Sequence, residues 1–150
     1  QQIVQLFTQA GFETHLVDDL DCLVWSKLVV NVGINALTAI LRVPNGILSE
    51  VAPARELLAA TVCEAAQVAT AKGIQLAYED AVAQVIEVAQ ATTSNRSSML
   101  QDVMRHSRTE IEVINGAIVR EAEQLGLKVP YNQALVALVR ALEATYGVRV

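Results

Sequence analysis

Apolar residues recur at helical spacing along most of the chain, and glycine or proline separates the repeating stretches. Only three prolines occur, and the many alanine, leucine, glutamate and glutamine residues favour helix. Gly11, Gly73 and Gly126 are placed to end helices. The pattern therefore predicts an all-α domain, with helices over residues 2–10, 18–42, 54–72, 79–91, 98–106, 109–125 and 132–146.

Three features depart from this helical pattern. Residues 12–17 alternate weakly between apolar and polar side chains, as a short strand would. Residues 44–46, Pro-Asn-Gly, predict a turn. Gly33 lies inside the helix over 18–42, where glycine costs about 1 kcal/mol relative to alanine, so we expect another part of the chain to pack closely there.

A polar stripe runs along the apolar helix over 18–42. Lys27, Asn31 and Asn35 recur every four residues and so lie on one helical face, and Thr38 continues the stripe. Such groups need partners if they are buried. In a structural role, Lys27 would lie at the helix edge and the asparagines would bond neighbouring helices. In a catalytic role, a lysine in a cleft would donate a proton to a carbonyl that is being reduced, beside asparagines that bind hydroxyl and carbonyl oxygens.

Composition and charge narrow the class of protein. The 150 residues suit one domain, and 11 basic against 16 acidic residues give a net charge of −5, which argues against nucleic-acid binding. Charged residues make up only 18% of the chain, and the mean hydropathy is +0.36. A membrane span over 28–41 is not expected, because asparagines interrupt a stretch that is already short. Cys22 and Cys63 are expected to be buried, reduced thiols of a cytoplasmic protein without a metal site.

Two later segments add candidate residues. Asn95 to Ser98 precede or begin a helix, where such residues either cap the helix or leave its N–H groups to bind an anion such as a carboxylate. Glu110 would lie in the first turn of the helix over 109–125, where an acid ordinarily complements the helix dipole. An Asn115-Gly116 pair inside that helix is typical of tight helix packing.

Four ordered blocks of sequence carry a family resemblance. They are Trp25-x-Lys27-Leu-x-x-Asn31-x-x-x-Asn35-x-Leu-Thr38, Asn45-Gly46, Asn95-x-x-Ser98-Met-Leu-Gln-Asp102 and Thr109-Glu110-Ile-x-x-Ile-Asn115-Gly116. Together they resemble the C-terminal helical domain of ketopantoate reductases (2-dehydropantoate 2-reductases), over about residues 18–146. The resemblance implies a helical domain like that of 6-phosphogluconate dehydrogenase, preceded by a Rossmann domain, with the active site between the two. It also implies reduction of 2-dehydropantoate to pantoate with NADPH, a step toward pantothenate and coenzyme A.

The resemblance also implies roles for particular residues. Lys27 matches the family's proton donor. Ser98 matches the residue that holds the substrate carboxylate, and Glu110 matches an acid that reaches the nicotinamide cofactor. Asn95 lies beside this set as a further candidate. The substrate-contacting asparagines of the family match Asn31, Asn35 and Asn45.

The chain departs from the family in one respect, because it contains no G-x-G-x-x-G segment for a dinucleotide. We therefore expect residues 1–17 to be the tail of a missing nucleotide-binding domain, and 18–150 to be the substrate-binding and catalytic domain. By itself the chain is expected neither to bind NADPH tightly nor to reduce ketopantoate. Two alternatives stay open: a reductase of another 2-oxo acid, and a non-catalytic helical oligomerisation module. The last helices, rich in alanine and valine, are also compatible with a homodimer face.

Overall fold

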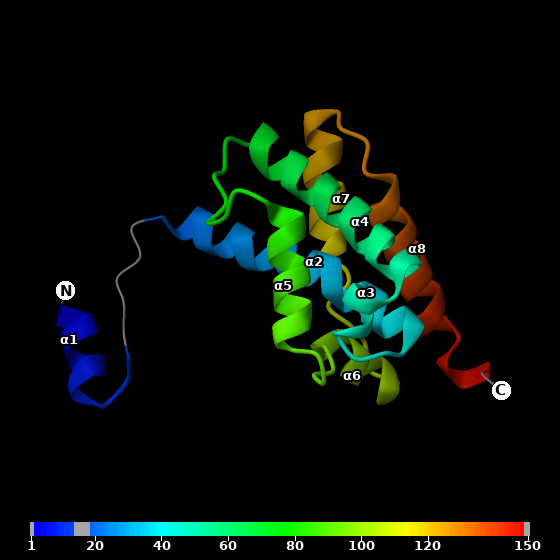
Figure 1. Ribbon diagram of the computed structural model, residues 1–150, viewed down its shortest axis with the longest axis horizontal. Helices are drawn as coiled ribbons and strands as arrows, with labels where there is room; N and C mark the ends of the chain where they lie inside the picture. Colours follow the sequence, from blue (N-terminus) through cyan, green and yellow to red (C-terminus); the bar gives the residue numbers. More distant parts are fainter. Residues whose placement is uncertain (1, 14–18, 149–150) are drawn as a thin grey trace.

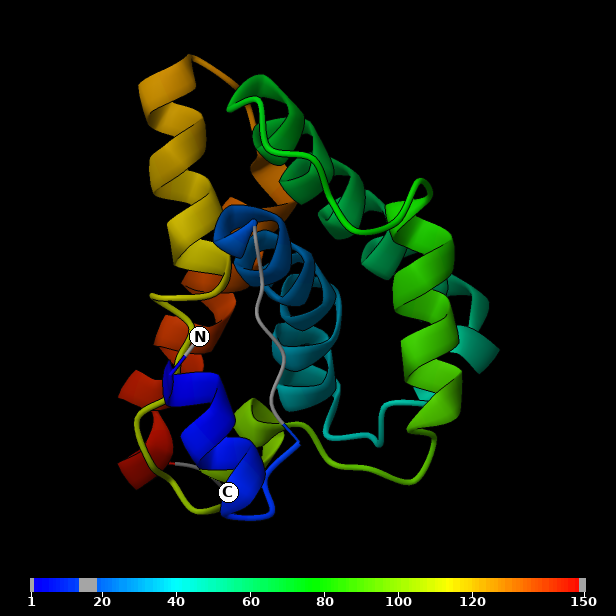
Figure 2. The ribbon, with the colours of Figure 1, turned by 90° about the vertical axis from the view of Figure 1, so that its left-hand side faces the viewer.

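A long central helix, α2 (Leu20–Leu41), organises the structure, and α4, α5, α6 and α8 pack against it. Figure 1 shows the arrangement along the chain in a computed structural model, which describes residues 2–13 and 19–148. Figure 2 shows α2 in the middle, with α4 and α5 on one side and α7 and α8 on the other. The remaining elements are α1 (Gln2–Gln9), α3 (Ile47–Glu50), α4 (Ala52–Ala71), α5 (Ala81–Ala91), α6 (Ser98–Met104), α7 (Asn115–Leu125), α8 (Pro130–Ala144) and the 3-10 turn η1 (Tyr146–Val148).

The all-α prediction is confirmed, since every regular element in the described residues is a helix. Most predicted helices appear within a few residues of their expected ends. Side-chain caps explain several boundaries: the Asp19 carboxylate accepts from Cys22 N at 2.9 Å at the start of α2, and that of Asp80 accepts from Ala83 N at 2.9 Å at the start of α5. Of the segment expected as a strand, residues 14–17 lie outside the described part, and residues 12–13 form no regular element.

The predicted helix over 109–125 is wrong in its first six residues. Residues 109–114 form a bend and turns instead of a helix, and α7 begins only at Asn115. The Glu143 carboxylate accepts from Thr109 N at 2.7 Å, and the Thr109 hydroxyl accepts from Ile111 N at 3.2 Å. These side chains satisfy N–H groups without a helix, which a periodicity argument cannot anticipate.

Asn115 therefore opens α7 instead of lying in its interior, and it belongs to a buried polar network. Its amide nitrogen donates to Val32 O at 3.2 Å and to Asn132 Oδ1 at 3.1 Å. The Asn132 amide donates to Glu64 Oε2 at 2.8 Å, and the same carboxylate accepts from Tyr131 N and Asn132 N, each at 2.9 Å. The network joins α2, α4, α7 and α8, and it places a carboxylate at the N-terminal end of α8.

The apolarity of α2 is explained by its place in the core. Among the described residues, α2 alone has the length and composition of a membrane span, but more than half of its most apolar stretch is buried by other helices. Its fully buried side chains include Val29, Val32 and Ala36. A core helix is therefore sufficient to account for the high mean hydropathy of this segment.

Apolar side chains are exposed near the N-terminal end of the chain. Ile3 and Leu6 of α1 are 73% and 69% exposed, and Leu23 and Val24 of α2 are about half exposed. In Figure 1, α1 lies apart from the other helices. The exposed apolar side chains of α1 and of the start of α2 therefore form two separate sets, each of a kind that is typical of contact with another protein part.

Gly33 allows α2 to lie close to two neighbouring helices, as the sequence predicted. A Cβ at this position would come within 2.6 Å of Val62 Cγ2 in α4 and 2.8 Å of Val85 Cγ1 in α5. Valine side chains are stiff and cannot swing away. The absence of a side chain at Gly33 therefore sets the spacing of α2, α4 and α5.

Gly33→Ala is expected to destabilise the domain. Overpacking costs about 1–3 kcal/mol, and the two contacts below 3 Å place this site toward the upper end. That cost exceeds the roughly 1 kcal/mol that alanine contributes as a helix former. Urea unfolding followed by circular dichroism measures the change, and the Gly33→Ala/Val62→Ala double variant is the control. In the double variant, alanine at 33 should cost less than it does against Val62. An equal cost in both backgrounds would contradict the packing explanation.

Candidate active site

The polar stripe on α2 passes from solvent into the interior of the domain. Lys27 is exposed, Asn31 is half-buried and Asn35 is only 6% exposed. None of these three side chains forms a hydrogen bond or an ion pair with any residue that the structure describes. A purely structural role would require Asn31 and Asn35 to bond neighbouring helices, and they do not. The stripe has donors and acceptors available to a polar ligand.

Thr38, at the inner end of the stripe, connects α2 to the start of α6. Its hydroxyl lies 2.7 Å from Ser97 Oγ, and both side chains are buried. Ser97 also caps α6, because its Oγ accepts from Leu100 N at 3.0 Å. The capping role expected in this segment thus belongs to Ser97. Ser98, the first residue of α6, is exposed, and its hydroxyl does not cap the helix.

The turn over residues 44–46 is bonded to the loop that precedes α6. Asn45 N donates to Asn95 O at 3.0 Å, and Gly46 N donates to Thr93 O at 3.2 Å. Gly46 has no room for a side chain, because a Cβ there would lie 2.9 Å from Thr93 Cα. The contacts bring Asn45 and Asn95, two of the predicted site residues, beside one another.

The side-chain amide of Asn45 has a fixed orientation. Thr92 Oγ1 donates its proton to Val88 O at 2.7 Å, so it accepts from Asn45 Nδ2 at 3.0 Å. Asn45 Oδ1 is buried, with no hydrogen-bond partner among the described residues. Sequence reasoning did not single out Thr92, because a threonine just after a helix is common.

Glu110 lies apart from this group. It is exposed in the turns between α6 and α7, instead of in a first helical turn as predicted. No hydrogen bond or ion pair joins its side chain to α2 or to the 92–98 segment. Two contacts bring the other candidates together: Asn45 N bonds Asn95 O, and Thr38 bonds Ser97. Thr38 is one helical turn from Asn35, and Ser97 directly precedes Ser98. Glu110 takes part in neither contact.

Ser26, next to Lys27, attaches α2 to the loop before α5. Its hydroxyl accepts from Ala77 N at 2.8 Å, and its backbone oxygen accepts from the Tyr78 hydroxyl at 2.9 Å. Burial, with a smaller contribution from the negative charge of Cys22, raises the pKa of Tyr78 to about 12. A serine in such an apolar helix is a sequence signal that could have indicated that Ser26 bonds another segment of the chain.

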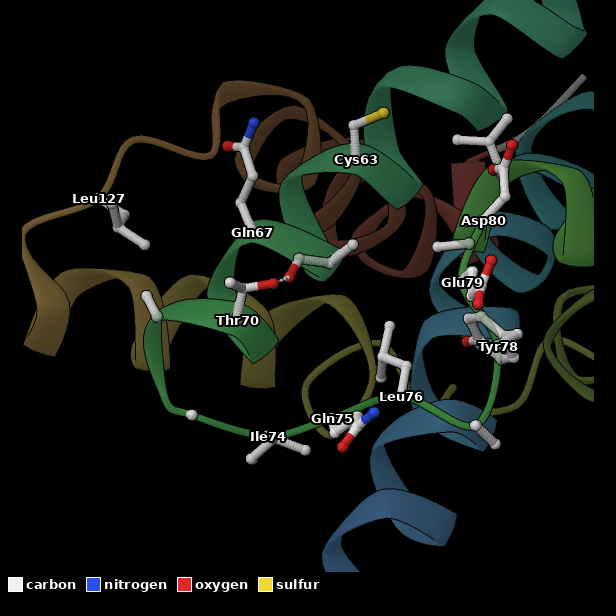
Figure 3. A pocket seen from close by; sticks show the side chains of 16 residues that line it. Cys63, Gln67, Thr70, Ile74, Gln75, Leu76, Tyr78, Glu79, Asp80 and Leu127 are labelled. Carbon is white, nitrogen blue, oxygen red and sulfur yellow. Dashed lines mark hydrogen bonds between the residues drawn. The ribbon is translucent and has the colours of Figure 1, made fainter.

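One hollow of the domain lies away from the polar stripe. It has a volume of about 1250 Å³ and lies between α4, the loop over 73–80 and the start of α5. Figure 3 shows Cys63, Gln67 and Thr70 along its α4 wall. Cys63 is exposed there and Cys22 is half-buried, so the expectation of two buried thiols is wrong. None of the predicted site residues lines this hollow.

A second, smaller hollow of about 690 Å³ borders the 92–98 segment. Its lining consists of Ser94, Asn95, Arg96, Gln101, Met104 and Arg105. It includes Asn95 but no residue of α2. The described residues contain no group of three or more side chains suited to hold a metal ion.

The sequence of the chain matches a known protein family. The model of the ketopantoate reductase PanE/ApbA C-terminal family matches residues 19–143. The chain is 40% identical to a 2-dehydropantoate 2-reductase from Archaeoglobus fulgidus, over 96% of this chain and 48% of that protein. The chain thus spans about half the length of the curated relatives it matches.

Solved structures agree with this comparison. A PanE/ApbA family ketopantoate reductase from Ralstonia eutropha JMP134 superposes with a TM-score of 0.90 at 33% identity, over 96% of this chain and 48% of that one. A D-mandelate dehydrogenase bound to NADH and anilino(oxo)acetate has a TM-score of 0.85 at 30% identity (98% and 48% covered). A dimeric ketopantoate reductase from Staphylococcus aureus has a TM-score of 0.87 at 27% identity (97% and 51% covered).

Tyr78 is expected to lose its proton near pH 12 in the folded domain. An unfolded tyrosine titrates near pH 10, so between pH 10 and 12 the folded state binds more protons than the unfolded state. The free energy of unfolding should therefore fall as the pH rises through this range. Ultraviolet titration of the phenols and urea unfolding at each pH measure both effects.

Tyr78→Phe should remove the titration step near pH 12 and flatten the alkaline loss of stability. Tyr131→Phe, at an exposed tyrosine, is the matched control and should leave both features in place. An alkaline titration that is unchanged by Tyr78→Phe would contradict the assignment.

Proposed function

The chain belongs to the ketopantoate reductase PanE/ApbA C-terminal family, and we propose that it is the substrate-binding half of an NADPH-dependent 2-dehydropantoate 2-reductase. The observation that carries the proposal is a set of polar side chains on α2 with no hydrogen-bond or ion-pair partner among the described residues: Lys27, Asn31 and Asn35. Relatives named 2-dehydropantoate 2-reductase at about 40% identity support the same activity.

In the proposed reaction, the carbonyl at C2 of the 2-oxo acid becomes an alcohol. NADPH, when bound, supplies the hydride that adds to C2. The Lys27 ammonium then donates a proton to the carbonyl oxygen, and its exposure at the open end of the stripe allows a substrate to reach it. A positive charge beside this oxygen also stabilises the negative charge that develops during hydride transfer.

The remaining residues would orient the substrate. The exposed Ser98 hydroxyl would donate to the substrate carboxylate, and Asn31 and Asn35 would bond its hydroxyl and carbonyl oxygens without adding charge. Asn45 would contribute through its buried, unpartnered Oδ1, which can only accept. Because that atom is buried, a substrate hydroxyl would reach it only after the Asn45 side chain moves.

The cofactor would be held mainly outside this chain. Glu110 is an exposed carboxylate without a side-chain partner in the described residues, so it is free to bond a hydroxyl of a nicotinamide nucleotide. No glycine-rich strand-turn-helix segment is present to bind the pyrophosphate. The isolated domain is accordingly predicted to be inactive, and NADPH as the preferred cofactor stays a prediction.

We assign the exposed apolar residues near the N-terminal end to contact with a nucleotide-binding domain. Ile3, Leu6, Leu23 and Val24 would be covered in such a contact, which would place that domain beside the Lys27 end of the stripe. The dimeric Staphylococcus aureus neighbour supports a homodimer as a further arrangement. A soluble enzyme of the cytoplasm is consistent with this proposal.

A reductase of another 2-oxo acid is the second candidate. It is favoured by the similarity to D-mandelate dehydrogenase, whose structure contains anilino(oxo)acetate. Assays of the full-length protein against 2-dehydropantoate and a panel of aryl and alkyl 2-oxo acids separate the two activities. A non-catalytic oligomerisation module is disfavoured, because such a module has no use for unpartnered polar groups along α2.

Lys27→Ala in the full-length reductase is expected to lower kcat by about 10²–10⁴, the usual contribution of a general acid. Steady-state kinetics with 2-dehydropantoate measure the loss. Lys128→Ala is the matched control, because Lys128 is also exposed and its side chain makes no hydrogen bond or ion pair with the described residues. Near-normal turnover by Lys27→Ala would remove Lys27 from the proposed role.

A further inference from the structure

Two buried hydroxyl groups connect the stripe on α2 to the start of α6. Thr38 Oγ1 lies 2.7 Å from Ser97 Oγ, 2.9 Å from Ile34 O and 3.1 Å from Asn35 O. Ser97 Oγ also lies 3.0 Å from Leu100 N. Thr38 is 0% exposed and Ser97 is 7% exposed, and each hydroxyl proton is already donated within the chain, so we assign neither side chain to the substrate.

The direction of each hydrogen bond in this chain follows from the number of protons. The carbonyl oxygens of Ile34 and Asn35 can only accept, so the single hydroxyl proton of Thr38 is donated to them. Thr38 Oγ1 must then accept from Ser97, and Ser97 in turn accepts from Leu100 N. Every donor and acceptor along the path is satisfied, which is the condition under which a buried polar path is rigid.

The path lies between two groups that the proposed function assigns to the substrate. Thr38 is one helical turn beyond Asn35 on the same face of α2, and Ser97 directly precedes Ser98. We propose that Thr38 and Ser97 are positioning residues, which hold the Ser98 hydroxyl at a fixed place relative to Asn35. This inference rests on the proposed function, because it concerns the geometry of that same site.

Thr61 shows that a buried threonine in this fold does not need a hydroxyl bond to another element, such as the one from Thr38 to Ser97. It is 1% exposed, and its hydroxyl donates to Leu57 O at 2.7 Å within its own helix, α4. Its hydroxyl makes no bond to another element. Thr38 has the same bond within its helix and, in addition, the bond to Ser97. Thr61→Val is therefore a matched control for Thr38→Val.

The test uses the full-length reductase and its steady-state kinetics. Thr38→Val keeps the shape of the side chain but leaves Ser97 without an acceptor on α2. We expect the KM for the 2-oxo acid to rise about tenfold while the KM for NADPH stays within about twofold, because misplacing one binding group weakens only its own ligand. Thr38→Ser, which keeps the hydroxyl, should restore the KM toward wild type, and Thr61→Val should leave both KM values unchanged.

A second pair of variants keeps the test decisive if Thr38→Val does not fold. Ser97→Ala removes the same bond from the other side but also removes a helix cap. Asp80→Ala removes the comparable cap of α5, which is unconnected to Thr38, and serves as its control. We expect both variants to lower the melting temperature and only Ser97→Ala to raise the KM for the 2-oxo acid.

Each result has a defined meaning. If Thr38→Val and Ser97→Ala change only the melting temperature, or raise both KM values alike, the positioning role is overturned. If the wild-type enzyme is active and Lys27→Ala is not, such a result leaves the proposed function intact. If the wild-type protein reduces no 2-oxo acid, the proposed function fails, and the positioning role fails with it.

Discussion

Close packing at Gly33 determines how α2 sits in the domain, and the other features of the structure depend on that placement. Because no Cβ would fit between α2 and the valines of α4 and α5, the helix can press one side against both neighbours. Residues 32–39 of α2 are buried on every face, because α6 and α8 also pack against the helix. The polar stripe of Lys27, Asn31 and Asn35 lies on another face and keeps donors and acceptors that no neighbouring helix uses. Because α2 is fixed by its packing, the stripe keeps its position although its side chains form no bonds to neighbouring helices.

The buried network around Glu64 and Asn132 fixes how α2, α4, α7 and α8 are placed relative to one another. A carboxylate and two asparagine amides bond backbone groups of α2, α4 and α8 far from solvent. Removing one partner from such a network leaves a buried polar group unsatisfied, at a cost of about 1–3 kcal/mol. The arrangement therefore fixes one relative placement of four helices, where apolar packing alone would tolerate several.

Sequence periodicity was sufficient to predict the features that are set within a single helix. It predicted α2, its polar stripe and the close approach at Gly33, because each follows from spacing along one helix. It failed at residues 109–114, where the caps come from Glu143, more than thirty positions away in the chain. It could not show that Ser97 rather than Ser98 caps α6, that Thr92 orients Asn45, or that Cys63 lies exposed. Those features depend on which segments meet in space.

The 92–98 segment illustrates how the two levels combine. Sequence alone proposed a cap or an anion site there, and the structure separates the roles. Ser97 caps α6 and bonds α2, while the exposed Ser98 hydroxyl bonds no residue that the structure describes. The most direct test is a crystal structure of the full-length protein with NADP⁺ and a non-reducible 2-oxo acid analogue. It should place the C2 oxygen of the analogue within hydrogen-bond distance of Lys27 Nζ and the carboxylate at Ser98. An analogue bound in the hollow beside Cys63, with Lys27 and Asn31 facing solvent, would contradict the account.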